Sequence, residues 1–178
     1  MHRLRKFYTD IVVPKLINQF GYKSVNDVPR IEKIVVNRGL DESCQNNKTL
    51  DALVSELTQV TGQRFYVTRS KKAISNFKLK QDVPIGMCVT LRRDKMYSFF
   101  DRLVNLALPR IRDFQGVKSS GFDRSGGFSF GLSDQSMFPE IDFDKINKFK
   151  GMDIVIVTTA KTRDETYLLL KELGMPFK

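Results

Sequence analysis

The order of helical and strand-like hydrophobic patterns along the 178 residues constrains the fold more than any other feature. Apolar residues recur with helical spacing in residues 4–20, 47–61, 96–108 and 164–173, and strand-like patterns occur in residues 30–38, 63–69, 86–93, 128–130 and 152–160. The order is helix, strand, helix, two strands, helix, two strands, helix. It predicts an α+β fold, with a largely antiparallel β-sheet, helices packed on one face and a split β-α-β-like arrangement. Since neither a linker nor an internal repeat is visible, we expect a single domain over residues 1–178.

Short signals predict where these helices bend, begin and end. Pro14 predicts either a kink in the first helix or the start of its second half. Asp94 is expected to cap the third helix, and Pro109 is expected to end it. Glycines are expected to end the other three helices: Gly21, Gly62 and Gly174.

Two predicted strands differ in how clearly their faces separate. In residues 30–38 both faces are mixed, so the pattern leaves open which one is buried: one carries Ile31, Lys33, Val35 and Asn37, the other Glu32, Ile34, Val36 and Arg38. In residues 86–93 the faces separate into Met87, Val89 and Leu91 on one side and Cys88, Thr90 and Arg92 on the other. We expect the apolar side to pack on the helices and the polar side to face outward.

Positive charge is concentrated in one part of the chain, whose net charge is +10. Residues 61–95 contain nine Lys or Arg and two acids, whereas residues 1–60 contain nine against seven and residues 96–178 twelve against eleven. Solvated surfaces normally mix the two signs, so this excess favours a polyanionic partner, nucleic acid before an anionic membrane surface. The longest uncharged stretches have nine residues and the N-terminus lacks an apolar signal core, so we expect neither a membrane-spanning segment nor secretion.

The most basic segment is predicted to be a long loop over residues 70–84. Residues 69–80 contain no acid, and their cations alternate with small, polar and apolar residues. Cations attract phosphates, and Phe77 suits stacking on a base or anchoring the loop. A long loop inside a compact domain is usually functional, which favours a binding role. A second long loop, rich in Gly and Ser, is expected over residues 115–136.

Residues with catalytic or metal-binding chemistry are few. His2 is the single histidine, which leaves no base for a Ser-His or Cys-His nucleophile. Cys44 and Cys88 lack the spacing of a zinc motif, and each is expected to be a small half-buried residue. Three acids alternate with apolar residues and are interpreted as a strand edge facing water: Glu140, Asp142 and Asp144. We therefore expect no catalytic residue, no metal site, no cofactor and no enzymatic activity.

Several runs, spread over essentially the whole chain, resemble the large-subunit ribosomal protein L-five family, the universal 5S rRNA-binding family, in its bacterial and plastid type. They stand in the family's order and spacing at residues 28–34, 61–63, 77–78, 84–86, 89–92, 109–114, 138–141, 158–161 and 176–177. Examples are Val-Pro-Arg-Ile-Glu-Lys-Ile at 28–34 and Pro-Arg-Ile-Arg-Asp-Phe at 109–114. Residues 96–99, 106–109 and 114–117 are more similar to plastid members than to others.

The resemblance implies a structural constituent of the large ribosomal subunit. Such a protein binds 5S rRNA in the central protuberance, contacts P-site tRNA through its basic loop and helps bridge to the small-subunit head. The family's 5S-facing positions match Asn37, Gln63, Thr90 and Arg92, with Lys33 as a further candidate. The tRNA-facing loop contributes the candidates Arg69, Lys71, Lys72, Ser75, Asn76, Phe77, Lys78 and Lys80.

The partners that the resemblance implies are 5S rRNA, 23S-type rRNA, P-site tRNA, neighbouring proteins of the central protuberance and protein thirteen of the small-subunit head. The implied location is the ribosome, in the plastid (chloroplast) stroma or the bacterial cytoplasm, with the plastid favoured. Two other classes stay as alternatives. An RNA-modifying enzyme would need a cofactor loop or an acid and base paired in a cleft. A free module acting on messenger RNA would present stacking aromatics on central strands, a role weakly suggested by Phe128 and Phe130.

The chain departs from the family's usual pattern at four places. Asp41 and Arg93 stand where the family usually has glycine. Lys80 replaces a frequent arginine, which keeps the attraction to phosphate but loses the planar fork. Residues 122–128 read Phe-Asp-Arg-Ser-Gly-Gly-Phe in place of a Phe-Asp-Gly-Arg-Gly-Asn-Tyr-like run. Family members use that loop, which contains Arg124, near the small-subunit head, so the individual contacts of its residues do not transfer from the family to this chain.

Overall fold

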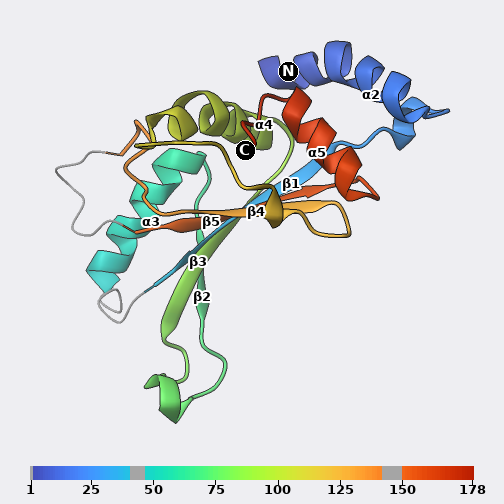
Figure 1. Ribbon diagram of the computed structural model, residues 1–178. Coiled ribbons are helices and arrows are strands. Elements are labelled where there is room, and N and C mark those ends of the chain that lie inside the picture. The colour runs from blue at the N-terminus through green and yellow to red at the C-terminus, as the bar shows by residue number, and fades with distance from the viewer. Residues whose placement is uncertain (1, 41–46, 142–149) are drawn as a thin grey trace.

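The computed structural model describes residues 2–40, 47–141 and 150–178, and in this part of the chain five strands form one antiparallel sheet (Figure 1). The strands are β1 (Ile31–Gly39), β2 (Tyr66–Arg69), β3 (Pro84–Leu91), β4 (Gly127–Leu132) and β5 (Met152–Thr158). Their order is β2-β3-β1-β5-β4, and each neighbouring pair is antiparallel. The predicted fold class is therefore confirmed.

The helices follow the predicted order. They are α1 (Arg3–Phe7), α2 (Val13–Phe20), α3 (Asn47–Thr61), α4 (Arg93–Arg102) and α5 (Arg163–Glu172). A π-helical turn over Tyr8–Val12 joins α1 to α2, so the predicted interruption at Pro14 takes the form of a widened turn just before the proline. Gly21 ends α2 with φ +69°, a left-handed conformation that suits glycine.

One face of the sheet is buried under the helices. Figure 1 shows α4 and α5 on the same side of the sheet. Alternate residues of the strands enter the core on that side and are almost fully buried: Ile34, Val36, Met87, Leu91, Phe128, Ile154 and Ile156. This answers the question that the mixed pattern of β1 left open, because the face that contains Ile34 and Val36 is the buried one.

The alternation of β1 fails at its first residues. A β-bulge between Ile31 and Lys33 shifts the register, and Ile31 is buried whereas Glu32 is exposed. The prediction that Ile31 shares a face with Lys33 is therefore wrong. A bulge inserts one residue into the ladder, which moves every side chain before it to the other face.

Some element ends also differ from the predictions. β2 begins at Tyr66 rather than at residue 63, and β3 spans Pro84–Leu91, so the basic loop covers residues 70–83. α4 begins at Arg93 with Arg92 in the cap position. Asp94 thus lies in the first turn, where an acid favours the helix dipole, and its predicted role as the cap is wrong.

The predicted strand edge around Glu140 is wrong as well. Glu140 lies in a turn and accepts a hydrogen bond from Nη1 of Arg102 on α4 at 2.6 Å. About three quarters of each side chain is buried, so the carboxylate gains a charged partner in place of water. Asp142 and Asp144 lie outside the described residues.

Candidate nucleic-acid interface

The second face of the sheet displays most of the polar side chains singled out from the sequence. Val35 lies opposite Thr90 of β3 and Val155 of β5, and Asn37 lies opposite Cys88 and Asp153. Residues opposite each other in a sheet point to the same face. Lys33, Asn37 and Thr90 therefore share the face that lies away from the core. Asn37 and Thr90 are exposed, and Lys33 is partly exposed.

The other two candidates lie beside Thr90, at the ends of helices. Gln63 follows α3 and donates a hydrogen bond from Nε2 to the main-chain oxygen of Thr90 at 3.1 Å, so it is not on the strand predicted for it. Arg92 directly follows β3, and its Nη1 is 3.6 Å from Oε1 of Glu32. About half of each of these two charged side chains is exposed. We call Lys33, Asn37, Gln63, Thr90 and Arg92 the platform.

The platform offers two cations and three neutral polar groups, on strands or directly beside the ends of strands and helices. Asn37 and Thr90 provide donors and acceptors on strands, whereas Lys33 and Arg92 provide charge. Two acids lie close to it, Glu32 beside Arg92 and Asp153 opposite Asn37. Such a surface suits an RNA helix, whose shallow groove presents 2′-hydroxyls and base edges between phosphates.

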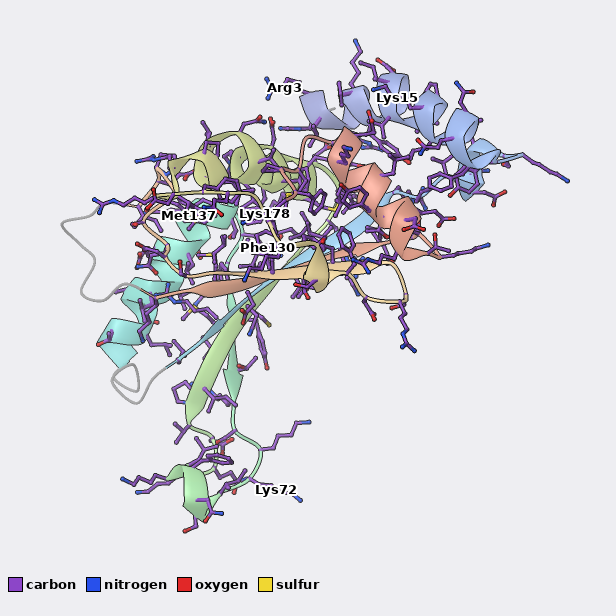
Figure 2. All side chains as sticks on the ribbon, in the orientation of Figure 1. Arg3, Lys15, Lys72, Phe130, Met137 and Lys178 are labelled. Atoms are coloured by element: carbon purple, nitrogen blue, oxygen red, sulfur yellow. The ribbon has the colours of Figure 1, made fainter. Side chains whose placement is uncertain are left out.

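The hairpin of β2 and β3 carries the basic loop away from the rest of the molecule (Figure 1), and Figure 2 shows Lys72 at its far end. Ser70 is buried at the neck of this loop, where its main-chain N–H donates to the oxygen of Val83 at 2.9 Å. Its hydroxyl donates to the oxygen of Lys80 at 2.5 Å and accepts from the N–H of Val83 at 3.2 Å. Arg69 donates to the main-chain oxygen of Asp82 at 2.9 Å. These bonds join residues 69–70 at the start of the loop to residues 80–83 at its end.

The tip of the loop is also held by main-chain hydrogen bonds. Ile74 and Leu79 exchange two bonds, of 2.9 and 3.1 Å, around a 3-10 turn over Ser75–Phe77. Lys78 follows with φ +50°. The loop residues predicted to face tRNA are exposed at this tip and along its sides, with the Phe77 side chain 74% exposed: Arg69, Lys71, Lys72, Ser75, Asn76, Phe77, Lys78 and Lys80.

Arg38 is a charged residue on the buried face of β1, a place that the charge of its side chain does not predict. It follows Ile34 and Val36 on the core face of β1 and is 1% exposed. Burial raises the pKa of Glu56 on α3, and the Arg38 cation opposes that rise. Its alternation with two apolar residues was the signal for burial. Arg38 therefore belongs to the interior and not to the platform.

The described residues do not support either alternative function. Phe128 is fully buried and Phe130 half-buried, so neither is displayed for stacking on the open face. A cavity of about 390 Å³ beside β4 is lined by apolar side chains, serines and glycines, and Lys118 is its only titratable lining residue. Within the described ranges, no three His, Cys, Asp or Glu residues are grouped to hold a metal ion, and no helix is long and apolar enough to cross a membrane. Cys88 is half-buried with a free thiol, whereas Cys44 lies outside the described residues.

Comparison with known proteins gives matches over nearly the whole chain. Residues 24–80 match the family described as Ribosomal protein L5, and residues 84–177 match the family that describes the C-terminus of the same ribosomal proteins. The chain is 58% identical to the large ribosomal subunit protein uL5c of Euglena gracilis, over 100% of this chain and 99% of that protein. It is 57% identical to uL5c of Pleurastrum terricola, over 100% and 96%.

A third relative has the same extent of similarity. The large ribosomal subunit protein uL5 of Rippkaea orientalis is 54% identical over 99% of this chain and 98% of that protein. The matches thus include plastid and cyanobacterial proteins and cover each partner almost completely. The chain therefore belongs to the ribosomal protein L5 family, in its plastid and cyanobacterial type, and is a structural constituent of the large ribosomal subunit and not an enzyme.

Proposed function

We propose that this protein binds 5S rRNA through the platform and contacts P-site tRNA through the basic loop. Membership in the large subunit implies rRNA and ribosomal protein partners. The observation that carries the proposal is that the protein has two separate polar surfaces. One is the open face of the sheet, where cations and acids lie close together, and the other is the projecting loop, where several cations are exposed. Two surfaces that differ in charge and rigidity suit two different RNA contacts.

The platform's chemistry supports the assignment of 5S rRNA to the sheet. Asn37 and Thr90 are fixed by the strand ladder, so little conformational entropy is lost when they bind. Contacts of neutral groups with 2′-hydroxyls and base edges recognise the shape of folded RNA. By contrast, a surface that binds mainly through phosphates needs more cations than Lys33 and Arg92, and Arg92 is already paired with Glu32.

The loop's geometry supports the assignment of tRNA. The loop stands at the end of a two-stranded extension, with Lys72 at its far end (Figure 2). Main-chain bonds between Ile74 and Leu79 hold the tip, so Phe77 is presented without support from the rest of the protein. A projecting, tied tip reaches a partner that the body of the protein does not touch.

We further propose that the turn over residues 123–126 faces the small-subunit head and its protein thirteen. Arg124 is exposed there, and the turn is closed by the bond from the N–H of Asp123 to the oxygen of Gly127 at 2.8 Å. The Ser125 hydroxyl and the Arg124 N–H donate to the Asp123 carboxylate and lower its pKa, so the acid stays ionised in the turn. This ordered turn stands where the family has its usual run.

The other partners that we propose for the protein are 23S-type rRNA and the neighbouring proteins of the central protuberance. We expect the ribosome that contains the protein to be that of a plastid.

The test of the main assignment uses photo-crosslinking from two positions of the full-length chain. A photoreactive residue replaces Thr90 in one variant and Lys72 in the other, and each is assembled into large subunits and then into ribosomes with P-site tRNA. We expect the first to crosslink to 5S rRNA with or without tRNA, and the second to crosslink to tRNA. Crosslinks of both variants to the same RNA would contradict the assignment of the platform and the loop to two different RNAs.

A further inference from the structure

Tyr66 is a large aromatic side chain left exposed on the edge strand β2. It is 71% exposed, and Phe77 is the other aromatic residue among those described that exceeds 70%. None of the ring stacking or cation-π contacts within the described ranges involves Tyr66. A tyrosine on a strand surface needs no explanation by itself, so its surroundings decide what it does.

The sheet register puts Tyr66 in one row with the platform. Tyr66 lies opposite Cys88 on β3, and Cys88 lies opposite Asn37 on β1. Met87 is fully buried on the core face, so its neighbour Cys88 points to the open face, and Tyr66 shares that face. Strands are about 4.8 Å apart, which puts Tyr66 roughly 10 Å from Asn37 across the sheet.

Residues on the turn that precedes Tyr66 add groups suited to RNA. Gln63, three residues earlier, is bound to the main chain of Thr90, two residues after Cys88. Arg64 is exposed and supplies a cation two residues before Tyr66. The ring therefore stands at the margin of a surface that already offers donors, acceptors and charge.

We propose that Tyr66 stacks on an unpaired base of the RNA bound by the platform, and so extends the interface onto β2. This inference rests on the proposed 5S rRNA-binding function. Exposed aromatic faces bind unstacked bases in many RNA-binding sheets, and the energy is insensitive to the base because every base has a π face. The neighbouring Arg64 then lies close to the backbone of the stacked nucleotide.

The first test separates the ring from the hydroxyl. Tyr66→Phe keeps the ring, and Tyr66→Thr removes it while keeping a residue that favours a strand. Stacking predicts that Tyr66→Thr weakens binding of 5S rRNA about 5- to 100-fold, whereas Tyr66→Phe stays within about twofold of the native chain. Equal losses in both variants would overturn the proposal, because the hydroxyl and not the ring would then make the contact.

The second test uses the absence of tryptophan from the sequence. Tyr66→Trp introduces a single indole whose fluorescence is quenched when a base stacks on it, and Phe77→Trp gives a matched reporter on the same hairpin. We expect 5S rRNA to quench the first strongly and the second little. Binding without quenching at residue 66, or equal quenching at both residues, would overturn the stacking. If the native chain does not bind 5S rRNA in a filter assay, the proposed function fails first and the inference fails with it.

Discussion

The side-chain amide of Gln63 donates to the main-chain oxygen of Thr90 at 3.1 Å and so joins the end of α3 to β3. Gly62 ends the helix with φ +70°, and the hydroxyl of Thr61 lies within hydrogen-bond distance of two main-chain acceptors, the oxygens of Leu57 and Gln63. The turn after α3 is thereby held against β3, although Gln63 and Thr90 are 27 residues apart in the sequence. Two platform residues that are distant in sequence are fixed to each other without any RNA.

Arg92→Ala is expected to weaken 5S rRNA binding by about 1–3 kcal/mol, because a charge-assisted contact is lost. The free energy of unfolding should change by less than about 1 kcal/mol, since the pair with Glu32 is half exposed. Filter binding and urea denaturation measure the two quantities. Unchanged 5S affinity in a folded Arg92→Ala protein would remove Arg92 from the interface.

Glu32→Gln is the matched control for that variant. It frees Arg92 from its acidic neighbour without removing the guanidinium, so 5S affinity should stay the same or increase. If Glu32→Gln instead weakens binding as much as Arg92→Ala, the ion pair positions Arg92 and the arginine alone is insufficient.

Neutralising the loop cations together is expected to leave 5S binding nearly unchanged. The variant carries Gln at Lys71, Lys72, Lys78 and Lys80, all of which are exposed on the projecting loop. Each phosphate contact contributes about 0.7–0.9 to the slope of log affinity against log salt. For the native chain we expect about three to five contacts, made by Lys33, Arg92 and the exposed cations next to the platform, Arg64 and Arg93. The slope should fall by less than about one contact in the variant. If the slope of the variant instead falls by most of its native value, the loop cations contact 5S rRNA and the assignment of the loop to tRNA is wrong.

The overall fold was readable from the sequence because burial is one-sided. In β3 the residues Met87, Val89 and Leu91 are buried, whereas Thr90 between them is exposed. Buried and exposed residues therefore alternate, and the same alternation of apolar and polar residues is visible in the sequence. Local pattern failed where tertiary contacts decide the structure. The bulge after Ile31 follows from pairing with β5, and Glu140 is fixed by Arg102, 38 residues earlier.

The platform was only partly readable. Alternation grouped Asn37 with Lys33 on one strand and Thr90 with Arg92 on another, but that Asn37 and Thr90 share one face across β1 and β3 requires the register. Tyr66 gave no signal, since an aromatic residue in a predicted strand normally points into the core. Its exposure follows from the edge position of β2 and from its place opposite Cys88.

Arg93→Gly is expected to stabilise the protein. Arg93 has φ +53°, in the left-handed region where a Cβ is strained. Relief of that strain should raise the free energy of unfolding by about 1 kcal/mol. Arg92→Gly is the control, because Arg92 has φ −136° and glycine there only adds chain entropy. Thermal unfolding should show a higher midpoint for Arg93→Gly and a lower midpoint for Arg92→Gly than for the native chain. Equal shifts of the two midpoints would show that the backbone at Arg93 is not strained.

Stability is expected to decrease above pH 10, in part through Tyr8. Burial raises the pKa of Tyr8 to about 12, with Tyr97 adding to the rise and Arg30 opposing it, and the hydroxyl donates to the oxygen of Pro29 at 3.0 Å. Between pH 10 and 12 the unfolded chain loses the Tyr8 proton while the folded chain keeps it, so the free energy of unfolding falls as pH rises. Burial also raises the pKa of Tyr22 and of Tyr97, which act in the same direction.

Tyr8→Phe isolates the contribution of this one residue. At pH 8 the variant should be less stable by about 1 kcal/mol, because the bond to Pro29 is lost. The phenylalanine cannot ionise, so the difference between variant and native chain should shrink as pH rises from 10 towards 12. Urea denaturation at steps between pH 8 and pH 11 measures this difference, with Tyr66→Phe as the control for an exposed hydroxyl. A difference that stays constant across that range would show that folding does not hold the proton on Tyr8.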